Sequence, residues 1–111
     1  VPGLIHSSIH NTSGYGATPY SNQLTIDRPS DKFHIFAMEW TPEFIAFYVD
    51  GRQVYQYKPD NKNEENWPFN KPAYLILNVA IGGTWGGEVD NSIFPATMTV
   101  DYVRVYQKNE L

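Results

Sequence analysis

The feature that most constrains this chain is an apolar run at residues 73–81, AYLILNVAI, which leads into the glycine-rich sequence GGTWGG. A run of this length that is rich in Leu, Ile and Val and stops at glycine predicts a long buried β-strand. Periodicity alone also permits a buried helix. Because the neighbouring segments all favour strands, we expect the run to be the central strand of a sheet.

Alternation along this predicted strand divides its side chains between two faces. One face is wholly apolar and is expected to lie in the core: Leu75, Leu77, Val79 and Ile81. The other face carries a lone amide, Asn78, and leads into the glycine loop that bears Trp85. An amide beside small residues, with an aromatic ring at the rim, is typical of a sugar-binding groove.

The composition fits one small domain and excludes several function classes. With 111 residues, of which 41% are hydrophobic, the chain can bury a core. The formal net charge of -4 argues against nucleic acid and anionic membranes as partners. No run approaches the roughly 20 apolar residues of a membrane span. Because the chain contains no cysteine, disulfides and thiolate zinc sites are excluded.

The rest of the chain alternates between predicted strands and polar loops. The clearest local signal is Asp50-Gly51, because a tight hairpin turn needs positive φ and this pair tolerates it. Strands of roughly eight to eleven residues, longer than the usual ~5–6, indicate a large curved sandwich of which the chain supplies part. We expect about six strands and no helix. Residues 11–32 are expected mainly as loop, with a short strand possible at residues 23–26. The expected strands are residues 4–10, 33–40, 44–49, 52–57, 73–81 and 97–107.

The strand predicted at residues 33–40, FHIFAMEW, contains three residues with functional side chains. Glu39 shares a face with apolar residues, which favours an ion pair over a catalytic role. Trp40 alternates with apolar residues and is expected in the core. We assign neither of these residues nor His34 to a functional site.

Three segments closely resemble one known family: FHIFAMEWTPEFIAFYVDGRQVYQY, WPFNKPAYLILNVAIGGTWGG and FPATMTVDYVRVYQ. In order and spacing they resemble the second half of glycoside hydrolase family sixteen, in its laminarinase (endo-1,3-β-glucanase) branch. The resemblance covers residues 6–107. It implies an all-β, concanavalin-like β-jelly-roll sandwich of two curved sheets, with a β-glucan across the concave sheet. It also implies a secreted protein, whose signal peptide we expect outside this chain.

The catalytic motif of that family does not occur in the sequence. Its members are retaining glycosidases, in which two carboxyl groups about 5–5.5 Å apart act as nucleophile and acid/base. The family carries them in a strand motif Glu-x-Asp-x-x-Glu, which precedes the segment that resembles LIHSSIH. We therefore expect residues 1–107 to be the C-terminal half of one jelly-roll domain and residues 108–111 to be a frayed tail. We expect no catalytic residue here, no turnover by the chain alone, and an N-terminal half as its partner.

The resemblance implies substrate-binding roles for four residues. It places a substrate-binding amide at Asn78 and a sugar-stacking indole at Trp85, where flanking glycines let the backbone bend around a ligand. Ser8 and His10 align with a strand that lines the cleft near the cleaved bond, where they would form hydrogen bonds with sugar hydroxyls. The residues themselves leave other interpretations open, namely a core amide, a loop anchor and partly exposed strand side chains.

The same resemblance implies a structural calcium site at Asp101, within VDYVRVY. In many family members this aspartate binds Ca²⁺ together with backbone carbonyls from the N-terminal half, and such oxygen ligands suit a hard cation. An ion pair or backbone amides could satisfy Asp101 instead. His6 and His10 cannot share a metal, because four residues of strand span ~13 Å. Glu88 and Asp90 are interpreted as solvated loop residues.

Two other function classes stay open from the sequence. A non-catalytic β-glucan-binding module of lectin type would use the same fold without the carboxylates. A purely structural sandwich domain would bind no sugar. The sequence does not choose among β-1,3-linked glucan, mixed-linkage glucan and galactan as the substrate.

Overall fold

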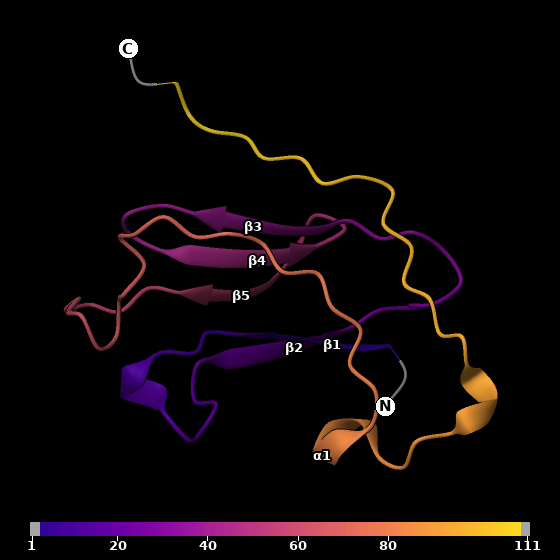
Figure 1. The fold of residues 1–111 in the computed structure, drawn as a ribbon. Coiled ribbons are helices and arrows are strands. Elements are labelled where there is room, and N and C mark those ends of the chain that lie inside the picture. The colour runs from indigo at the N-terminus through magenta and orange to yellow at the C-terminus, as the bar shows by residue number, and fades with distance from the viewer. Residues whose placement is uncertain (1–2, 110–111) are drawn as a thin grey trace. The chain divides into compact units, whose positions relative to one another are not determined.

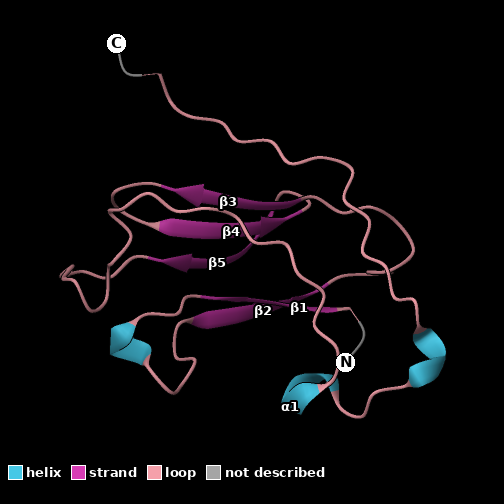
Figure 2. Cartoon of the chain, in the orientation of Figure 1, coloured by secondary structure: helices cyan, strands magenta, loops and turns pink. Residues whose placement is uncertain are grey.

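The computed structural model describes residues 3–109 and divides into two units, Val1–Ala73 and Tyr74–Leu111. Each unit is described by itself. Within the described residues, Figure 2 shows strands only in the first unit. The elements in chain order are β1 (Leu4–Ser8), the 3₁₀ turn η1 (Thr12–Gly14), β2 (Ser21–Thr25), β3 (Phe36–Trp40), β4 (Ile45–Val49), β5 (Arg52–Tyr57), the helical turn α1 (Gly83–Gly86) and the 3₁₀ turn η2 (Asn91–Ile93).

The first sheet of the first unit is the antiparallel pair β1–β2 (Figure 1). Its last pair is Ser8 opposite Ser21, and the backbone N–H of Ile9 continues the pairing by donating to the carbonyl of Tyr20 at 2.8 Å. Strand β2 overlaps the short strand that the sequence makes possible at residues 23–26, although this stretch is expected mainly as loop. The strand expected at residues 4–10 is shorter than predicted, because the chain turns into the polar η1 loop after this last bond.

The second sheet has the order β3-β4-β5 and is antiparallel throughout. The hairpin predicted at Asp50-Gly51 is confirmed, since the two residues have φ values of 49° and 80°. Strand β5 has the predicted bounds. One irregularity was not predicted: the register shifts between Phe47 and Tyr48, so that Val54 on β5 has no partner of its own.

Two clusters of buried side chains form the core of the first unit. They consist of Ile9, Ile45, Tyr57 and Trp67 in the first cluster and Ile26, Val49 and Val54 in the second. The rings of Tyr57 and Trp67 stack with centroids 5.9 Å apart and an interplanar angle of 15°. Burying each of these side chains contributes roughly 1.5–3 kcal/mol. Through Trp67, the first cluster joins the loop at residues 58–72 to the strands.

Strand β3 lies at an edge of its sheet, and all five of its residues are exposed. The expectation that Trp40 lies in the core is wrong for this structure: the residue is 43% exposed, and its indole N–H donates to the carbonyl of Phe69 at 3.1 Å. The ion pair expected for Glu39 is also wrong within the described chain, because an exposed carboxylate on an edge strand is solvated without one.

The second unit contains only α1 and η2 among its described residues, so the strands expected at residues 73–81 and 97–107 are wrong for this structure. The expected absence of helix is wrong at α1 as well. A segment becomes a strand only when a neighbour supplies backbone hydrogen bonds, and the two segments form no ladder within the unit. The face predicted as core is exposed: Leu75, Leu77, Val79 and Ile81. No helix in the described part of the chain is long and apolar enough to cross a membrane.

The predicted tail at residues 108–111 lies partly outside the described residues, which end at 109. Residues 108 and 109 carry no helix or strand assignment among the residues described.

Candidate functional site

Ser8 and His10 lie close together in the sequence at the end of β1 in the first unit. Ser8 is the last residue of the strand and is half-buried, whereas His10 follows the strand and is exposed. The prediction that His10 belongs to the strand is therefore wrong, because β1 ends two residues earlier. Ile9 between them is 6% exposed and belongs to the core.

Trp85 is carried by α1, a single helical turn bounded by glycines. Gly82, Gly83 and Gly87 have φ values of 75°, 79° and 73°, which glycine adopts without strain. The N–H of Gly87 donates to the carbonyl of Gly83 at 2.9 Å and closes the turn. Trp85 is 76% exposed. A broad, exposed indole face can stack on a pyranose ring.

Asn78 lies in the same unit as Trp85, and it is exposed and outside any helix or strand. Its amide can donate two hydrogen bonds and accept two, which is the chemistry that adjacent sugar hydroxyls require. Ser8 and His10 lie in the other unit. The structure describes the two units separately, so a shared groove for these four residues stays a prediction.

Asp101 is exposed and lies outside any helix or strand. The expectation of a carboxylate inside a strand is therefore wrong, and a solvated Asp101 needs no internal partner. No group of three or more His, Asp or Glu side chains that could hold a metal ion occurs among the residues described. The calcium site at Asp101 stays a prediction, because it depends on carbonyl ligands from outside this chain.

Glu88 and Asp90 have the spacing of the first two acids in the family motif, but Ile93 occupies the place of the final glutamate. The structure shows a local role for Asp90. Its Oδ1 accepts hydrogen bonds from the hydroxyl of Ser92 at 2.6 Å and from the backbone N–H of Ser92 at 2.9 Å. These bonds hold the pKa of Asp90 below its usual 3.8. Asp90 thus caps η2, in agreement with the interpretation as a loop residue.

Sequence reasoning missed one hollow in the first unit. It measures about 450 Å³ and is lined by Trp40, Thr41, Pro42, Phe69, Asn70, Lys71 and Pro72. The lining offers an indole, an amide and an ammonium group but no carboxylate, so the hollow can bind a ligand but cannot hydrolyse a glycoside. In the sequence, the only sign of this hollow is a proline in each of the two loops that line it, Pro42 and Pro72. Prolines indicate turns, but they do not show that two turns will pack together.

Comparison with known proteins identifies the family. The family described as "Glycosyl hydrolases family 16" matches residues 2–104. A β-glucanase of Rhodothermus marinus is 37% identical over 116 aligned residues, which cover 96% of this chain and 40% of the relative. A keratan-sulfate endo-1,4-β-galactosidase of Sphingobacterium multivorum is 36% identical, with coverage of 94% of this chain and 25% of the relative.

A solved structure agrees with these sequence matches. The crystal structure of laminarinase from Flavobacterium sp. UMI-01 superposes with a TM-score of 0.80 and 41% sequence identity. The alignment covers 86% of this chain and 42% of the laminarinase chain. The chain therefore spans less than half the length of these relatives. The likeness confirms the predicted fold class, an all-β sandwich of the jelly-roll type.

Proposed function

Because the chain belongs to family 16 of the glycosyl hydrolases, we propose that it is the C-terminal part of a retaining endo-1,3-β-glucanase of the laminarinase type. The chain contributes walls of the substrate cleft, and a separate N-terminal segment contributes the catalytic carboxylates. The observation that carries this proposal is the family match over residues 2–104 of a sequence that lacks Glu-x-Asp-x-x-Glu. Hydrolysis with retention needs two carboxyl groups about 5–5.5 Å apart, so the chain alone is inactive.

The proposed roles of the binding residues follow from their chemistry. Trp85 stacks on a glucose ring, and its 76% exposure supports this role. Asn78 forms hydrogen bonds with neighbouring sugar hydroxyls through its amide. Ser8 and His10 form hydrogen bonds with sugar near the cleaved bond. Together they hold the glucan while the carboxylates of the other segment act on it.

Exposed apolar side chains in the second unit are consistent with a fold that is completed by other parts of the protein, among which the proposal places the N-terminal segment. These side chains have nothing within their own unit to bury them. Contiguous exposed apolar surface marks an interaction site in a soluble protein. They include Tyr74, Leu75, Ile76, Leu77, Val79, Ile81, Met98, Val100, Tyr102, Val103, Val105 and Tyr106.

Three further properties belong to the same proposal. The substrate is a β-1,3-glucan, which is supported by the 41% identity to a laminarinase. Asp101 and backbone carbonyls of the N-terminal segment hold a structural Ca²⁺. The complete protein is secreted, as expected for an enzyme whose substrate is an extracellular polysaccharide.

Titration calorimetry with laminari-oligosaccharides tests the binding roles in the complete protein. Asn78→Ala and Trp85→Ala should each weaken binding by about tenfold, which corresponds to about 1.4 kcal/mol. Tyr15→Ala is the matched control for an exposed aromatic ring, since Tyr15 is 91% exposed and has no assigned role. Unchanged affinity in both Asn78→Ala and Trp85→Ala would contradict the proposed cleft and favour a purely structural domain.

The rival lectin-type module differs in what the isolated chain does. A lectin binds laminari-oligosaccharides as an isolated folded chain and gains no turnover when an N-terminal segment is added. The proposed enzyme half binds weakly alone and tightly in the complete protein, because its cleft is complete only there.

A further inference from the structure

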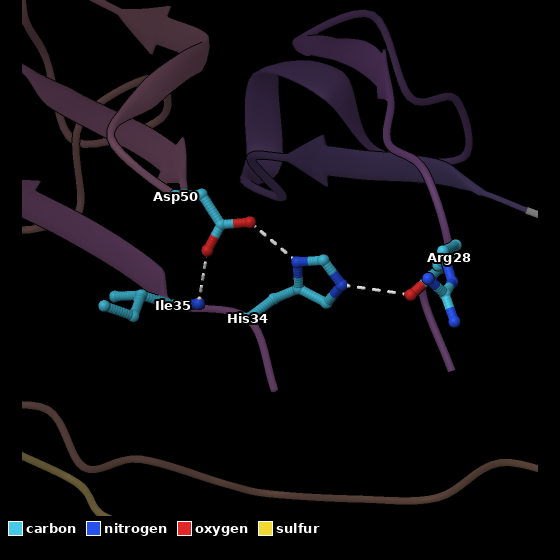
Figure 3. Close-up of polar contacts among 4 residues, drawn as sticks. All are labelled: Arg28, His34, Ile35 and Asp50. Carbon is cyan, nitrogen blue, oxygen red and sulfur yellow. Dashed lines mark hydrogen bonds and ion pairs between the residues drawn. The ribbon is translucent and has the colours of Figure 1, made fainter. Parts of the chain in front are cut away.

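The imidazole of His34 lies between two hydrogen-bond acceptors from different parts of the first unit (Figure 3). Its Nδ1 lies 2.6 Å from Oδ2 of Asp50, in the turn between β4 and β5. Its Nε2 lies 3.2 Å from the backbone carbonyl oxygen of Arg28, in the loop before β3. The side chain of His34 is only 4% exposed, whereas that of Asp50 is 44% exposed.

The backbone around this histidine is held in an uncommon conformation at both acceptors. Arg28 and Asp50 are the non-glycine residues with positive φ in the described chain, at 52° and 49°. Asp50 is further fixed by Ile35: its Oδ1 accepts from the N–H of Ile35 at 2.8 Å, and its own N–H donates to the carbonyl of Ile35 at 2.9 Å. The turn is thus tied to the start of β3, and His34 extends that tie to the Arg28 loop.

The two acceptors fix the number of protons on the ring. A carboxylate oxygen and a backbone carbonyl can only accept, so each facing nitrogen must carry a hydrogen for both bonds to form. An imidazole with hydrogens on both nitrogens is a cation. A neutral ring has one hydrogen, and the charge-assisted bond to Asp50 is the stronger of the two. A neutral His34 would therefore turn a lone pair toward the carbonyl of Arg28 and lose that bond.

We propose that His34 is a proton-operated latch, which as an imidazolium fastens the Arg28 loop to the β4–β5 turn and on losing its proton releases the loop. Release lets Arg28 leave its positive-φ conformation, which is unfavourable for a residue with a Cβ. The β4–β5 turn stays tied to Ile35 through Asp50, so the loop is the part that moves.

The charged groups around the ring favour the latched state. The hydrogen bonds that His34 donates to Asp50 and then to the Arg28 carbonyl raise the pKa of His34 above its usual 6.5, and desolvation and then the ammonium of Lys32 oppose them. The hydrogen bonds that Asp50 accepts from the His34 ring and then from the Ile35 N–H hold the pKa of Asp50 below its usual 3.8. The guanidinium of Arg28 is itself engaged with Asp31 at 3.1 Å on the exposed side of the loop.

The directions of the His34 and Asp50 pKa shifts define the pH range over which the latch is closed. Because the pKa of His34 is raised on folding, its stabilisation is complete below 6.5 and is lost as the pH rises through the raised value. Because the pKa of Asp50 is lowered, its stabilisation is complete above 3.8 and is lost as the pH falls through the lowered value. The latch is therefore fully closed between these two ordinary values, and it opens on the alkaline side by loss of the His34 proton.

NMR of the complete protein tests this directly. The His34 ring, assigned by comparison with His34→Gln, should titrate above its ordinary pKa, with both ring nitrogens protonated at pH 6. Hydrogen exchange at the Asp31 amide, whose N–H donates to the Arg28 carbonyl at 3.3 Å, corrected for its intrinsic pH dependence, should lose protection severalfold across the same titration. A ring that is neutral at pH 6, or loop protection that does not follow the His34 titration, would overturn the latch.

Two variants separate the latch from a merely structural histidine. Asp50→Asn keeps a residue that suits the positive-φ turn but removes the charge, so the pKa of His34 should fall and the loss of loop protection should move to lower pH. Lys32→Gln removes the opposing ammonium from an exposed position. The pKa of His34 should therefore rise, and the loss of loop protection should move to higher pH. If Asp50→Asn does not fold, Lys32→Gln alone tests the latch. An unchanged His34 titration in Lys32→Gln would contradict the roles assigned to the charged groups around the ring.

Discussion

The phenolic oxygen of Tyr57 lies 2.6 Å from the backbone carbonyl oxygen of Asn66, to which it donates a hydrogen bond. The side-chain amide of Asn11 donates to both groups, at 3.0 Å to the Tyr57 oxygen and 3.0 Å to the Asn66 carbonyl. The three residues come from the η1 loop, the end of β5 and the loop at residues 58–72. This triangle of hydrogen bonds joins the η1 loop to the end of β5 and to the loop that follows it, across 46 and 55 residues of sequence.

Tyr57→Phe should lower the free energy of unfolding by about 1–3 kcal/mol. The substitution keeps the ring that stacks on Trp67 but removes the hydroxyl, which leaves one donor and one acceptor of the triangle with a partner fewer. Urea denaturation of the folded protein measures the change. Tyr55→Phe is the matched control on the same strand, because the Tyr55 hydroxyl has no hydrogen bond within the described chain, and it should change stability little.

Asn11→Ala should destabilise the protein at least as much as Tyr57→Phe. Besides its two donated bonds, the Asn11 side-chain oxygen accepts from the N–H of Gly14 at 3.0 Å and from the hydroxyl of Ser13 at 2.8 Å, and so caps η1. Combining Asn11→Ala with Tyr57→Phe should cost less than the sum of the single changes, since both remove the bond that joins them. Strictly additive losses would show that the triangle is not a unit.

Gly3→Ala should be more destabilising than Gly51→Ala. Both glycines have positive φ, 85° and 80°, where an added Cβ costs roughly 1–2 kcal/mol. A Cβ at Gly3 would also lie 2.5 Å from the carbonyl oxygen of Ile26, whereas one at Gly51 would meet open space. The clash should add about 1–3 kcal/mol. Thermal denaturation of the two variants gives the comparison, and equal melting temperatures would contradict it.

The sequence was most informative where the structure is decided locally. Asp50-Gly51 specifies its hairpin because the turn depends on two residues only, and β5 followed with its predicted bounds. The register shift at Val54 was not predictable, because it depends on how β5 meets β4. Residues 73–81 have the composition of a buried strand, but composition supplies no hydrogen-bonding neighbour, and their own unit has none to offer.

The candidate site shows the same limit. The glycines around Trp85 predicted that the backbone could bend sharply there, and three of them have positive φ, whereas the sugar contact of Trp85 stays a prediction. The links of His34 to Asp50 and to the Arg28 carbonyl join residues 16 and 6 positions apart, and no periodic pattern signals them. The pairing of Asn78 and Trp85 with Ser8 and His10 depends on how distant parts of a sandwich assemble, which neither alternation nor composition determines.

The most direct test of the proposed function is the release of reducing sugar from a β-1,3-glucan by the purified chain, alone and mixed with an N-terminal segment that carries Glu-x-Asp-x-x-Glu. The chain alone should give no turnover, and the mixture should hydrolyse the glucan with retention of the anomeric configuration. Turnover by the rigorously purified chain alone would contradict the account, because it would mean that the catalytic carboxylates lie within these residues.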